Sequence, residues 1–486
     1  MRRACFAFLA FLLLTTACAA ERPTLADGAA REVEPVESDV ANETGEIADD
    51  RPVLQLAVTD GWSLDPADAG PASLTNRVIA DLLYEGLTTV DASGEPLPAL
   101  AERWFVSDDR LTWTFVLPET LTDGQGEAIT ARDVKMSLER IAARGSADQA
   151  ATALLAVAGW RDRMDGIAGG VAGISAPDPT TLVVRLTSPF ELLLEVLASP
   201  AFGVTGESDR GLRTTGAFAR TDIPFRFDAR SESATVSALQ LVTNPAGPAA
   251  ALAAGDADWA VLATGDASSD LNADIIRQPL DLEVAIVARS PQKDVRLGLL
   301  DSLEPLLLAT TVDGLSARTS PGPSTAGVLP DAVIIDLPDG HLAEMGDAIV
   351  SQLEAAGVRV LVASSEPTGF AARVAAGEAL LFPIVIAGGT GPAGAALRLS
   401  VPGASDDVFG PESDARVELA QAVVTELDRE QRALFVNALE RALLEDGLLL
   451  PIGQFEVRVA IGRRLNGLRH RADGTLDLSG VEFAEP

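Results

Sequence analysis

The residue types that most often perform chemistry are few in this chain or poorly placed for it. The two histidines, His341 and His470, are too far apart in the sequence to suggest a shared metal site or a proton relay, and we expect both on the surface. The stretch Gly388–Gly391 could approach a phosphate through its backbone N–H groups. Pro392 follows at once, however, and no helix carrying a lysine begins there, so the sequence predicts a plain loop. We expect neither a metal ion nor a cofactor.

Carboxylates are so abundant that their proximity in the sequence has no value as a sign of acid–base chemistry. The segment Asp256-Ala257-Asp258-Trp259 could open a calcium loop, but further oxygen ligands do not follow at the required spacing, and we expect a turn before a strand. The sequence contains none of the motifs GxSxG, GxxxxGK[ST], HExxH and CxxC. These observations predict a protein that is not an enzyme.

Length and charge narrow the class of protein further. The 486 residues are enough for two or three domains with a sizeable core. Lys and Arg number 37 against 71 Asp and Glu, which gives a net charge of −34. Because phosphate binding needs clustered cations, we expect no nucleic-acid partner, and anionic lipid does not attract such a chain by charge alone. An apolar content of 47% excludes wholesale disorder.

The N-terminus has the features of an export signal. Two arginines precede an apolar run, Ala4–Leu14, which is too short to span a bilayer and predicts a signal peptide over residues 1–17. Leu14-Thr-Thr-Ala-Cys18 resembles a bacterial lipobox, in which the cysteine sulfur receives a diacylglycerol. An ordinary cleaved signal with a chance cysteine is the alternative. We expect Cys18 to anchor the protein through lipid at the outer face of the cytoplasmic membrane.

Residues 18–51 differ in composition from the rest of the chain. Beyond Cys18 they are rich in Asp and Glu and poor in large apolar residues, which predicts a disordered acidic tether between the lipid and a folded body. Cys5 leaves with the signal peptide, and no cysteine follows Cys18. A disulfide within the folded body is therefore impossible.

Hydrophobic periodicity and turn residues predict an α/β body. In its first part we expect strands at 53–58, 111–117 and 181–186. Helices are expected at 74–84 and from the capping box Thr130–Asp133 onward. After residue 330 the order strand, helix, strand, helix, strand favours a parallel sheet. We expect these elements at 333–335, 341–356, 358–362, 370–376 and 380–386, followed by a helix at 430–445 and a buried strand at 448–452.

A series of motifs follows the same order along the chain as in one known family. They are Asp81-Leu-Leu-Tyr-Glu-Gly-Leu-Thr-Thr-Val-Asp91, Gly94–Trp104, Leu111–Leu117, Asp123–Gly124, Ile129–Val134, Ser137–Arg140, Val171–Asp178, Leu182–Leu186, Ser188–Phe190, Lys293–Arg296 and Thr425–Pro451. Together they resemble the family 5 extracellular solute-binding proteins, the peptide- and nickel-type receptors of ABC importers. The resemblance covers about residues 50 to 486 with gaps.

The resemblance implies a two-lobed periplasmic-binding-protein-like fold of type II with an extra inserted domain. Lobe one would comprise residues 52–86, 168–290 and 453–486, the inserted domain residues 87–167, and lobe two residues 291–452. A small molecule or peptide would lie in the cleft between the lobes, and closure would hide it. The loaded receptor, a monomer, would then dock on the permease subunits of an ABC transporter.

The matching order also implies which residues face the cleft. They are Trp62, Asp68, Ala69, Gly70, Tyr84, Thr215, Gly216, Gly388, Gly389 and Thr390. Asp68 is the best candidate for the partner of a cation, with a solvated turn residue as the alternative. For Trp62 the alternative is packing at a sheet edge, and for Tyr84 it is a place in the core of a helix.

Two departures from the family pattern bear on the ligand. Peptide receptors of this family pair the ligand's ammonium with an Asp near a Trp, and the matching stretch here, Ile384–Ala396, has neither residue. Because a buried ammonium without a carboxylate is strongly penalised, we do not expect ordinary α-amino peptide binding. The segment Thr214–Phe218 resembles the family's GTGPY with Pro and Tyr replaced, and the following stretch is shortened near Ala229–Ala234. These departures leave a second hypothesis, an envelope lipoprotein that has lost its transport cleft and acts as a scaffold or regulator.

Overall fold

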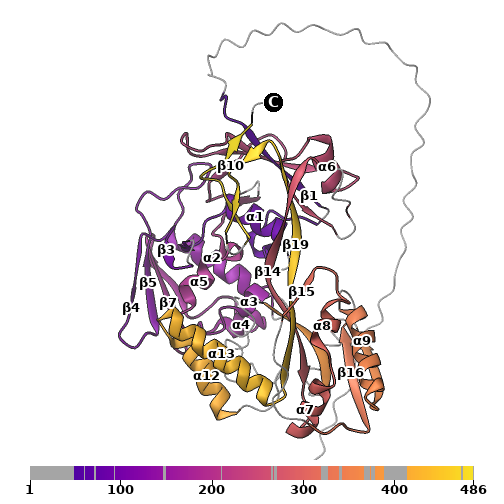
Figure 1. Ribbon diagram of the computed structural model, residues 1–486. Coiled ribbons are helices and arrows are strands. Elements are labelled where there is room, and N and C mark those ends of the chain that lie inside the picture. Colours follow the sequence, from indigo (N-terminus) through magenta and orange to yellow (C-terminus); the bar gives the residue numbers. More distant parts are fainter. Residues whose placement is uncertain are drawn as a thin grey trace, which may run out of the picture. The chain divides into compact units, whose positions relative to one another are not determined.

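The computed structural model of the chain is drawn in Figure 1. It describes residues 49–59, 61–70, 73–91, 94–145, 149–208, 211–263, 266, 271–318, 327–338, 342–365, 373, 378–387, 413–471 and 474–484. Residues Asp49–Pro486 form one compact unit. The predicted signal peptide, the lipid attachment at Cys18 and nearly all of the predicted tether lie outside the described residues, as does His341.

One large sheet organises this unit. Its strands are β1 (Val53–Val58), β10 (Phe218–Arg220), β11 (Arg226–Ala229), β12 (Ala238–Thr243), β13 (Trp259–Leu262), β14 (Ala273–Ala288), β15 (Leu315–Ala317), β16 (Ala332–Pro338), β17 (Arg359–Ser365), β18 (Leu381–Ala387) and β19 (Leu449–Gly462). The strand order is β10-β11-β12-β1-β13-β19-β14-β18-β16-β17, and β15 pairs with β19 as well. β1 pairs in parallel with β12 and β13, and β16 in parallel with β17 and β18.

Two strands of the large sheet, β14 and β19, are much longer than the others, at 16 and 14 residues. They pair with each other in antiparallel fashion and run side by side through the molecule (Figure 1). One half of the pair lies beside β13, and the other half lies beside β18 and β15. The register shifts between Pro279 and Glu283 and again between Val284 and Ala285, where the two halves meet. Such irregularities bend a strand and sharpen its twist, so we expect the long pair to bend where its two halves meet.

The first helix confirms the sequence-based prediction closely. α1 (Leu74–Leu83) begins at Ser73, whose hydroxyl accepts the N–H of Asn76, and it ends at Tyr84. Its apolar face packs Val78, Leu82 and Leu83 into a core shared with β1, β12 and β13. The helix therefore covers the half of the large sheet that contains β1, β12 and β13.

A second, four-stranded sheet has the order β4-β5-β7-β6. Its strands are β4 (Arg103–Val106), β5 (Thr112–Val116), β6 (Ile174–Asp178) and β7 (Thr181–Arg185). Trp113 and Phe115 point from β5 into a core that also takes Val134, Leu138 and Ile141 of α2 (Ala131–Ala142). The predicted capping box is present, since the Thr130 N–H donates to the Asp133 carboxylate at 2.9 Å. β6 and β7 lie beyond residue 167, where we expected the inserted domain to end, and the sheet continues to Arg185.

The second half of the chain confirms the predicted strand and helix order where it is described. β16, α9 (Ala343–Ala355) and β17 form a parallel unit, and β18 returns beside β16. Gly357, with φ +90°, lies just beyond the end of α9, where a left-handed residue commonly ends a helix. α12 (Asp414–Thr425) leads into α13 (Arg429–Glu445), whose N-cap Asp428 accepts the Gln431 N–H at 3.0 Å. The helix predicted at 370–376 lies outside the described residues apart from Arg373.

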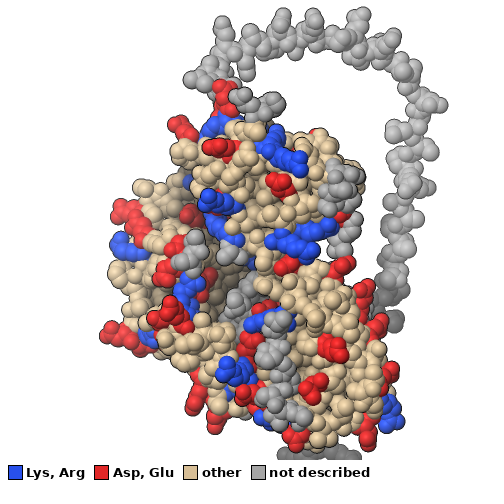
Figure 2. Space-filling view, viewed as in Figure 1, with Lys and Arg blue, Asp and Glu red and all other residues tan. Residues whose placement is uncertain are grey.

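Shorter elements complete the fold. They are η1 (Pro66–Asp68), β2 (Thr88–Val90), β3 (Pro96–Pro98), α3 (Gln149–Thr152), α4 (Trp160–Met164), α5 (Leu193–Leu197), η2 (Pro200–Phe202), β8 (Gly206–Ser208), β9 (Gly211–Arg213), α6 (Pro248–Ala254), α7 (Lys293–Asp301), α8 (Pro305–Ala309), β20 (Leu465–Asn466), β21 (Arg469–His470), β22 (Leu476–Asp477) and β23 (Glu482–Phe483). Among the described residues, no helix has the length and apolar character needed to cross a bilayer. On the face drawn in Figure 2, acidic and basic side chains are interspersed, although acidic residues outnumber basic ones in the chain.

Candidate functional site

The turn that follows β1 holds four of the residues predicted to face a cleft, and hydrogen bonds fix its shape. The Ser63 N–H donates to Asn76 Oδ1 at 3.0 Å, and the Ser63 hydroxyl donates to Asp68 Oδ2 at 2.6 Å. The Ala67 N–H donates to Asp65 Oδ1 at 2.9 Å. These bonds tie η1 to the first turn of α1, so the turn presents its side chains in a defined direction.

Asp68, the predicted partner of a ligand cation, already has a cation within the protein. Its Oδ1 lies 2.5 Å from Arg144 Nη2 of the segment after α2, and Asp65 is paired in the same way with Arg140 of α2. Burial alone would raise the pKa of Asp68, but the hydrogen bonds from Ser63 and Arg144 outweigh it and lower the pKa. Asp68 is therefore neither a solvated turn residue nor an unoccupied carboxylate.

The two aromatic candidates are packed against the protein. Trp62 meets Phe225 edge to face, with ring centroids 5.2 Å apart and an interplanar angle of 87°, which supports its alternative role in packing at the sheet edge. Tyr84 is only 3% exposed, and its hydroxyl donates to the Leu64 carbonyl at 2.7 Å. Burial raises the pKa of the Tyr84 hydroxyl. Ala69 is buried as well, at 2% exposure.

Thr215 and Gly216 pack closely against the C-terminal end of α1. The Thr215 hydroxyl donates to the Val204 carbonyl at 2.7 Å, and the Gly216 N–H donates to the Leu83 carbonyl at 2.9 Å. A Cβ on Gly216 would lie 2.7 Å from the Tyr84 nitrogen, so only glycine fits this close backbone approach. The structure thus brings Tyr84, Thr215 and Gly216 together. Gly388, Gly389 and Thr390 lie outside the described residues.

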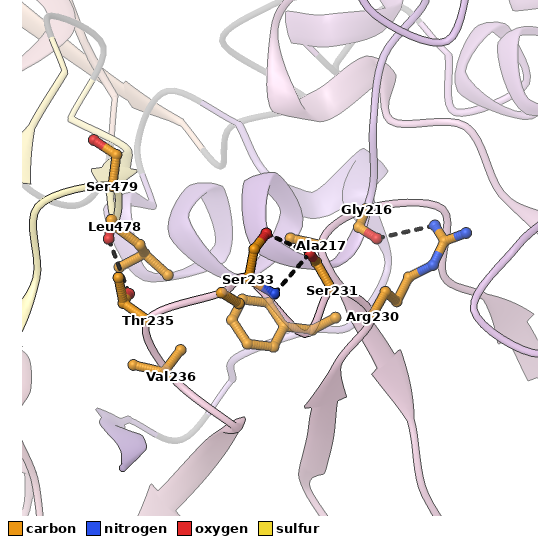
Figure 3. Close-up of a pocket in the computed structure, with 11 residues that line it drawn as sticks. Gly216, Ala217, Arg230, Ser231, Ser233, Thr235, Val236, Leu478 and Ser479 are labelled. Carbon is orange, nitrogen blue, oxygen red and sulfur yellow. Dashed lines mark hydrogen bonds between the residues drawn. The ribbon is translucent and has the colours of Figure 1, made fainter. Parts of the chain in front are cut away.

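A hollow of about 570 Å³ opens beside Gly216, and Figure 3 shows the residues around it. Its lining residues are mostly small or apolar, with several hydroxyls: Gly216, Ala217, Phe218, Arg230, Ser231, Ser233, Ala234, Thr235, Val236, Leu478 and Ser479. The Ser231 and Ser233 hydroxyls bond each other at 2.8 Å, and the Thr235 hydroxyl donates to the Leu478 carbonyl at 3.1 Å. The volume is in the range of ligand pockets.

The loop that lines this hollow is held from both sides by arginines. Arg51, just before β1, donates to the carbonyls of Ser231, Glu232 and Ala234 at 2.9 to 3.0 Å. Arg230 reaches the other way and donates to backbone carbonyls that include Gly216 (Figure 3). Because two guanidinium groups fix the backbone of the loop, the hollow is preformed.

Two charged residues of this region, Glu85 and Arg230, were not among the site residues predicted from the sequence. Glu85 lies within the motif Asp81–Asp91, but nothing in the neighbouring residues distinguishes it from any other acidic residue. Its N–H donates to the Thr215 hydroxyl at 3.0 Å. Arg230 lies in the shortened stretch and has no sequence signal at all, because its role depends on carbonyls that are distant in the chain.

Of two predictions elsewhere in the chain, the one for His470 is wrong and the one for the segment before Trp259 is confirmed. His470 is half-buried instead of exposed, because its ring stacks on Trp259 with centroids 6.3 Å apart and its Nε2 accepts the indole N–H at 3.3 Å. The segment before Trp259 is a turn that leads into β13, as predicted. Its Asp258 is fully buried and pairs with Arg464. Within the described part of the chain, no group of three or more His, Cys, Asp or Glu side chains could hold a metal ion.

Comparison with known proteins supports the resemblance inferred from the motifs. Residues 95–281 match the model of the bacterial extracellular solute-binding proteins, family 5, middle region. This segment of the chain is therefore similar to the family 5 extracellular solute-binding proteins. The match includes the small sheet, α2 and the Thr215–Gly216 segment, so the residues of the candidate site lie partly inside the matched segment.

Curated relatives match over short stretches. The oligopeptide-binding protein OppA of Salmonella typhimurium is 30% identical over 163 residues, which cover 32% of this chain and 29% of OppA. The glutathione-binding protein GsiB of Escherichia coli K12 is 31% identical over 139 residues, which cover 29% of this chain and 24% of GsiB. The chain thus matches less than a third of the length of these relatives.

Solved structures match over nearly the whole chain. HbpA2 from Haemophilus parasuis has a TM-score of 0.68 at 16% identity and covers 89% of this chain and 100% of its own. The murein tripeptide-binding protein MppA in its unliganded open form has a TM-score of 0.66 at 17% identity, covering 90% of this chain and 98% of its own. At these identities the likeness shows the fold, which is the two-lobed α/β fold of type II.

Proposed function

We propose that this chain is the solute-binding component of an ABC importer, which captures a small solute between its two lobes and delivers it to the permease subunits. The observation that carries the proposal is the pair of long strands, β14 and β19, which belong to both halves of the large sheet and are irregular where the halves meet. A receptor that closes on its ligand needs such a bend, because the closed state makes contacts with the ligand that the open state cannot make.

The relatives indicate the class of solute. OppA is named for oligopeptides and GsiB for glutathione, and MppA for a murein tripeptide. The proposed solute is therefore peptide-like. The proposed lobes are those of the sequence analysis, with β6 and β7 of the small sheet packed together with the inserted domain.

A screen for ligands tests this proposal directly. The full chain is heated with a library of di- and tripeptides, glutathione and sugars, and the melting temperature is followed by tryptophan fluorescence. A solute present at 100 times its Kd stabilises a receptor by about 2.7 kcal/mol. Stabilisation by members of one chemical class is the expected result. The absence of any shift across the library would contradict solute capture.

A second candidate function is a scaffold or regulator that keeps the fold without transport. Asp68 and Tyr84 favour it, because both have their polar groups satisfied inside the protein. Under this function the screen above would give no shift, and the protein would be recovered with a protein partner instead of a solute.

We further propose that Cys18 is lipidated and holds the protein, as a monomer, at the outer face of the cytoplasmic membrane. Acyl chains on this residue would anchor the chain, since stable anchoring needs more than one. Cys18→Ala is expected to move the protein from the membrane fraction to the soluble fraction, measured by immunoblot after ultracentrifugation. Cys5→Ala is the matched control and should leave the protein on the membrane. Membrane retention of the Cys18→Ala variant would refute the anchor.

A further inference from the structure

The two halves of the large sheet are connected by more than the long strands β14 and β19. The helices α12 and α13 belong to the half that contains β18, because Val423 and Leu439 pack in one core with Phe382 of β18. The small sheet, α2 and α5 share another core, and we call them together the small-sheet region. The junction of α12 and α13, residues 424–432, contacts this region, which lies beside the two helices in Figure 1.

The small-sheet region is attached to the opposite half of the large sheet, the half that contains β1. Arg140 of α2 pairs with Asp65 in the turn that follows β1. Arg144, just beyond α2, pairs with Asp68 of the same turn. Ala67, also in this turn, is buried in the core of the small-sheet region. The α12–α13 junction therefore links one half of the large sheet to a region that is fixed to the other half.

A buried side chain and a backbone hydrogen bond hold the junction at its first residue. Val424 is only 2% exposed and packs in the core of the small-sheet region. Its carbonyl accepts the N–H of Glu191 at 2.7 Å. Val423, the residue before it, packs in the core of α12, α13 and β18. Two consecutive residues are thus buried on the two sides of the contact.

Two arginines, one from each side, add polar contacts. Arg432 of α13 donates to Glu195 Oε1 of α5 at 2.7 Å, and its side chain is only 12% exposed. Arg110, in the turn between β4 and β5, donates to the Thr425 carbonyl at the end of α12 at 3.3 Å and pairs with Glu191 at 2.8 Å. The last carbonyls of a helix carry partial negative charge, so a cation is favourable there. Salt screens such partly buried pairs less than exposed ones.

The backbone of Arg110 supports a specific role for this contact. Its φ is +58°, a left-handed conformation that Phe225 alone shares with it among the described residues other than glycine. A residue with a side chain is uncommon there and persists where its surroundings hold it. The Arg110 N–H donates to the Ser107 carbonyl at 2.8 Å, which closes the turn. The turn thereby directs the guanidinium toward α12.

We propose that the α12–α13 junction is a latch, whose contacts with the small-sheet region must release before the two halves of the large sheet can move apart. The long strands join the halves in one place and the junction joins them in another, so bending of β14 and β19 pulls on the junction. Contacts at both of its ends, Val424 and Arg432, also resist rotation about the junction itself. A solute that favours another arrangement must supply the free energy of release. The inference goes beyond the proposed function, because it names a restraint that acts before any solute binds.

The distance between the halves, measured by pulsed electron paramagnetic resonance on the full chain, tests the latch. Ala253→Cys on α6 and Glu354→Cys on α9 place one spin label in each half, at exposed helical positions. Cys5→Ala and Cys18→Ala remove the two native cysteines, so that only the introduced ones are labelled. With the latch engaged, this labelled background should give one narrow distance distribution.

Variants then assign the restraint to the junction. Glu195→Gln keeps the size of the side chain but removes the charge that Arg432 contacts. It should raise the population of a second distance about tenfold, because loss of one partner of a protected ion pair shifts an equilibrium by at least that factor. Arg432→Gln should act alike, and the double variant should add nothing, since both changes break the same contact. Val424→Ala tests the apolar part of the junction and should also populate the second distance.

Glu119→Gln is the matched control, because Glu119 is exposed in a turn and has no ion pair among the described residues. It should leave the distance distribution unchanged, and circular dichroism checks that every variant is folded. One narrow distribution in all variants would overturn the inference, since the junction would then not restrain the halves. A broad distribution in the labelled background would overturn it as well, because the contact would not be engaged in solution. Neither result bears on solute capture, which the ligand screen tests separately.

Discussion

Gly216 offers the sharpest test of the site geometry. A Cβ at this position would lie 2.7 Å from the Tyr84 nitrogen, 2.8 Å from the Leu83 carbonyl carbon and 2.9 Å from the Leu82 oxygen. All three are backbone atoms, so a side-chain rotation cannot make room. The end of α1 or the Thr215–Gly216 segment must shift instead. Overpacking of this kind costs about 1–3 kcal/mol, and we expect Gly216→Ala to lose that much stability.

Gly70→Ala is the matched control for this substitution. Gly70 belongs to the same set of predicted cleft residues, but a Cβ there would meet nothing within 4 Å, and its backbone needs no left-handed conformation. The added methyl group restricts the unfolded chain, so Gly70→Ala should be neutral or stabilising by about 0.4–1 kcal/mol. Urea denaturation followed by tryptophan fluorescence gives both values. Hydrogen exchange of the Tyr84 and Glu85 amides should rise in the Gly216→Ala variant alone.

The outcome that would refute this reasoning is equal stability of the two variants. It would mean that α1 and the Thr215–Gly216 segment are not in contact in solution. The bond from the Glu85 N–H to the Thr215 hydroxyl would then be absent as well, because it depends on the same contact.

Two further substitutions test electrostatic contacts. Asp123, whose side chain is fully buried, lies 2.7 Å from Arg213 and accepts the N–H groups of Gln125 and Glu127, so Asp123→Asn should cost about 3 kcal/mol in urea denaturation. Asp109→Asn, at an exposed position, should change stability little, and similar losses for both would contradict the buried pair. The pKa of Asp68 is lower in the folded protein than its ordinary value of 3.8, so its contribution to stability is present above that pH and is lost as the pH falls further. The wild type should therefore be more stable than the Asp68→Asn variant at pH 6, and the difference should shrink toward pH 2; a difference independent of pH would contradict the ion pair.

Local structure was largely predictable from the sequence, because the signals are local. Strand β1, helix α1, the capping box before α2 and the N-cap of α13 all follow from alternation, 3.6-residue periodicity and capping residues. The parallel order of β16, β17 and β18 also follows from the alternation of strands and helices. For the single elements, the residues that determine the structure lie within about one turn or strand of each other.

The burial and the bonding partners of the site residues were less predictable, because they depend on residues far away in the chain. Asp68 looked like a turn residue open to solvent, but Arg144, which pairs with it, follows a helix in another part of the fold. His470 looked exposed, but Trp259 covers it from a different strand. Arg230 gave no signal, since its role depends on the carbonyls of Thr122, Thr215 and Gly216, which lie elsewhere in the chain.

The long pair β14 and β19 has a consequence for dissecting this protein. β14 precedes the segment that forms α9 and β16–β18, whereas β19 follows it, and each strand contributes residues to both halves of the large sheet. A fragment cut to contain one lobe would expose a row of unpaired N–H and C=O groups along a severed ladder, and such bare edges promote self-association. Truncated versions of either lobe should therefore precipitate on expression, and the two halves are best treated as a single cooperative folding unit.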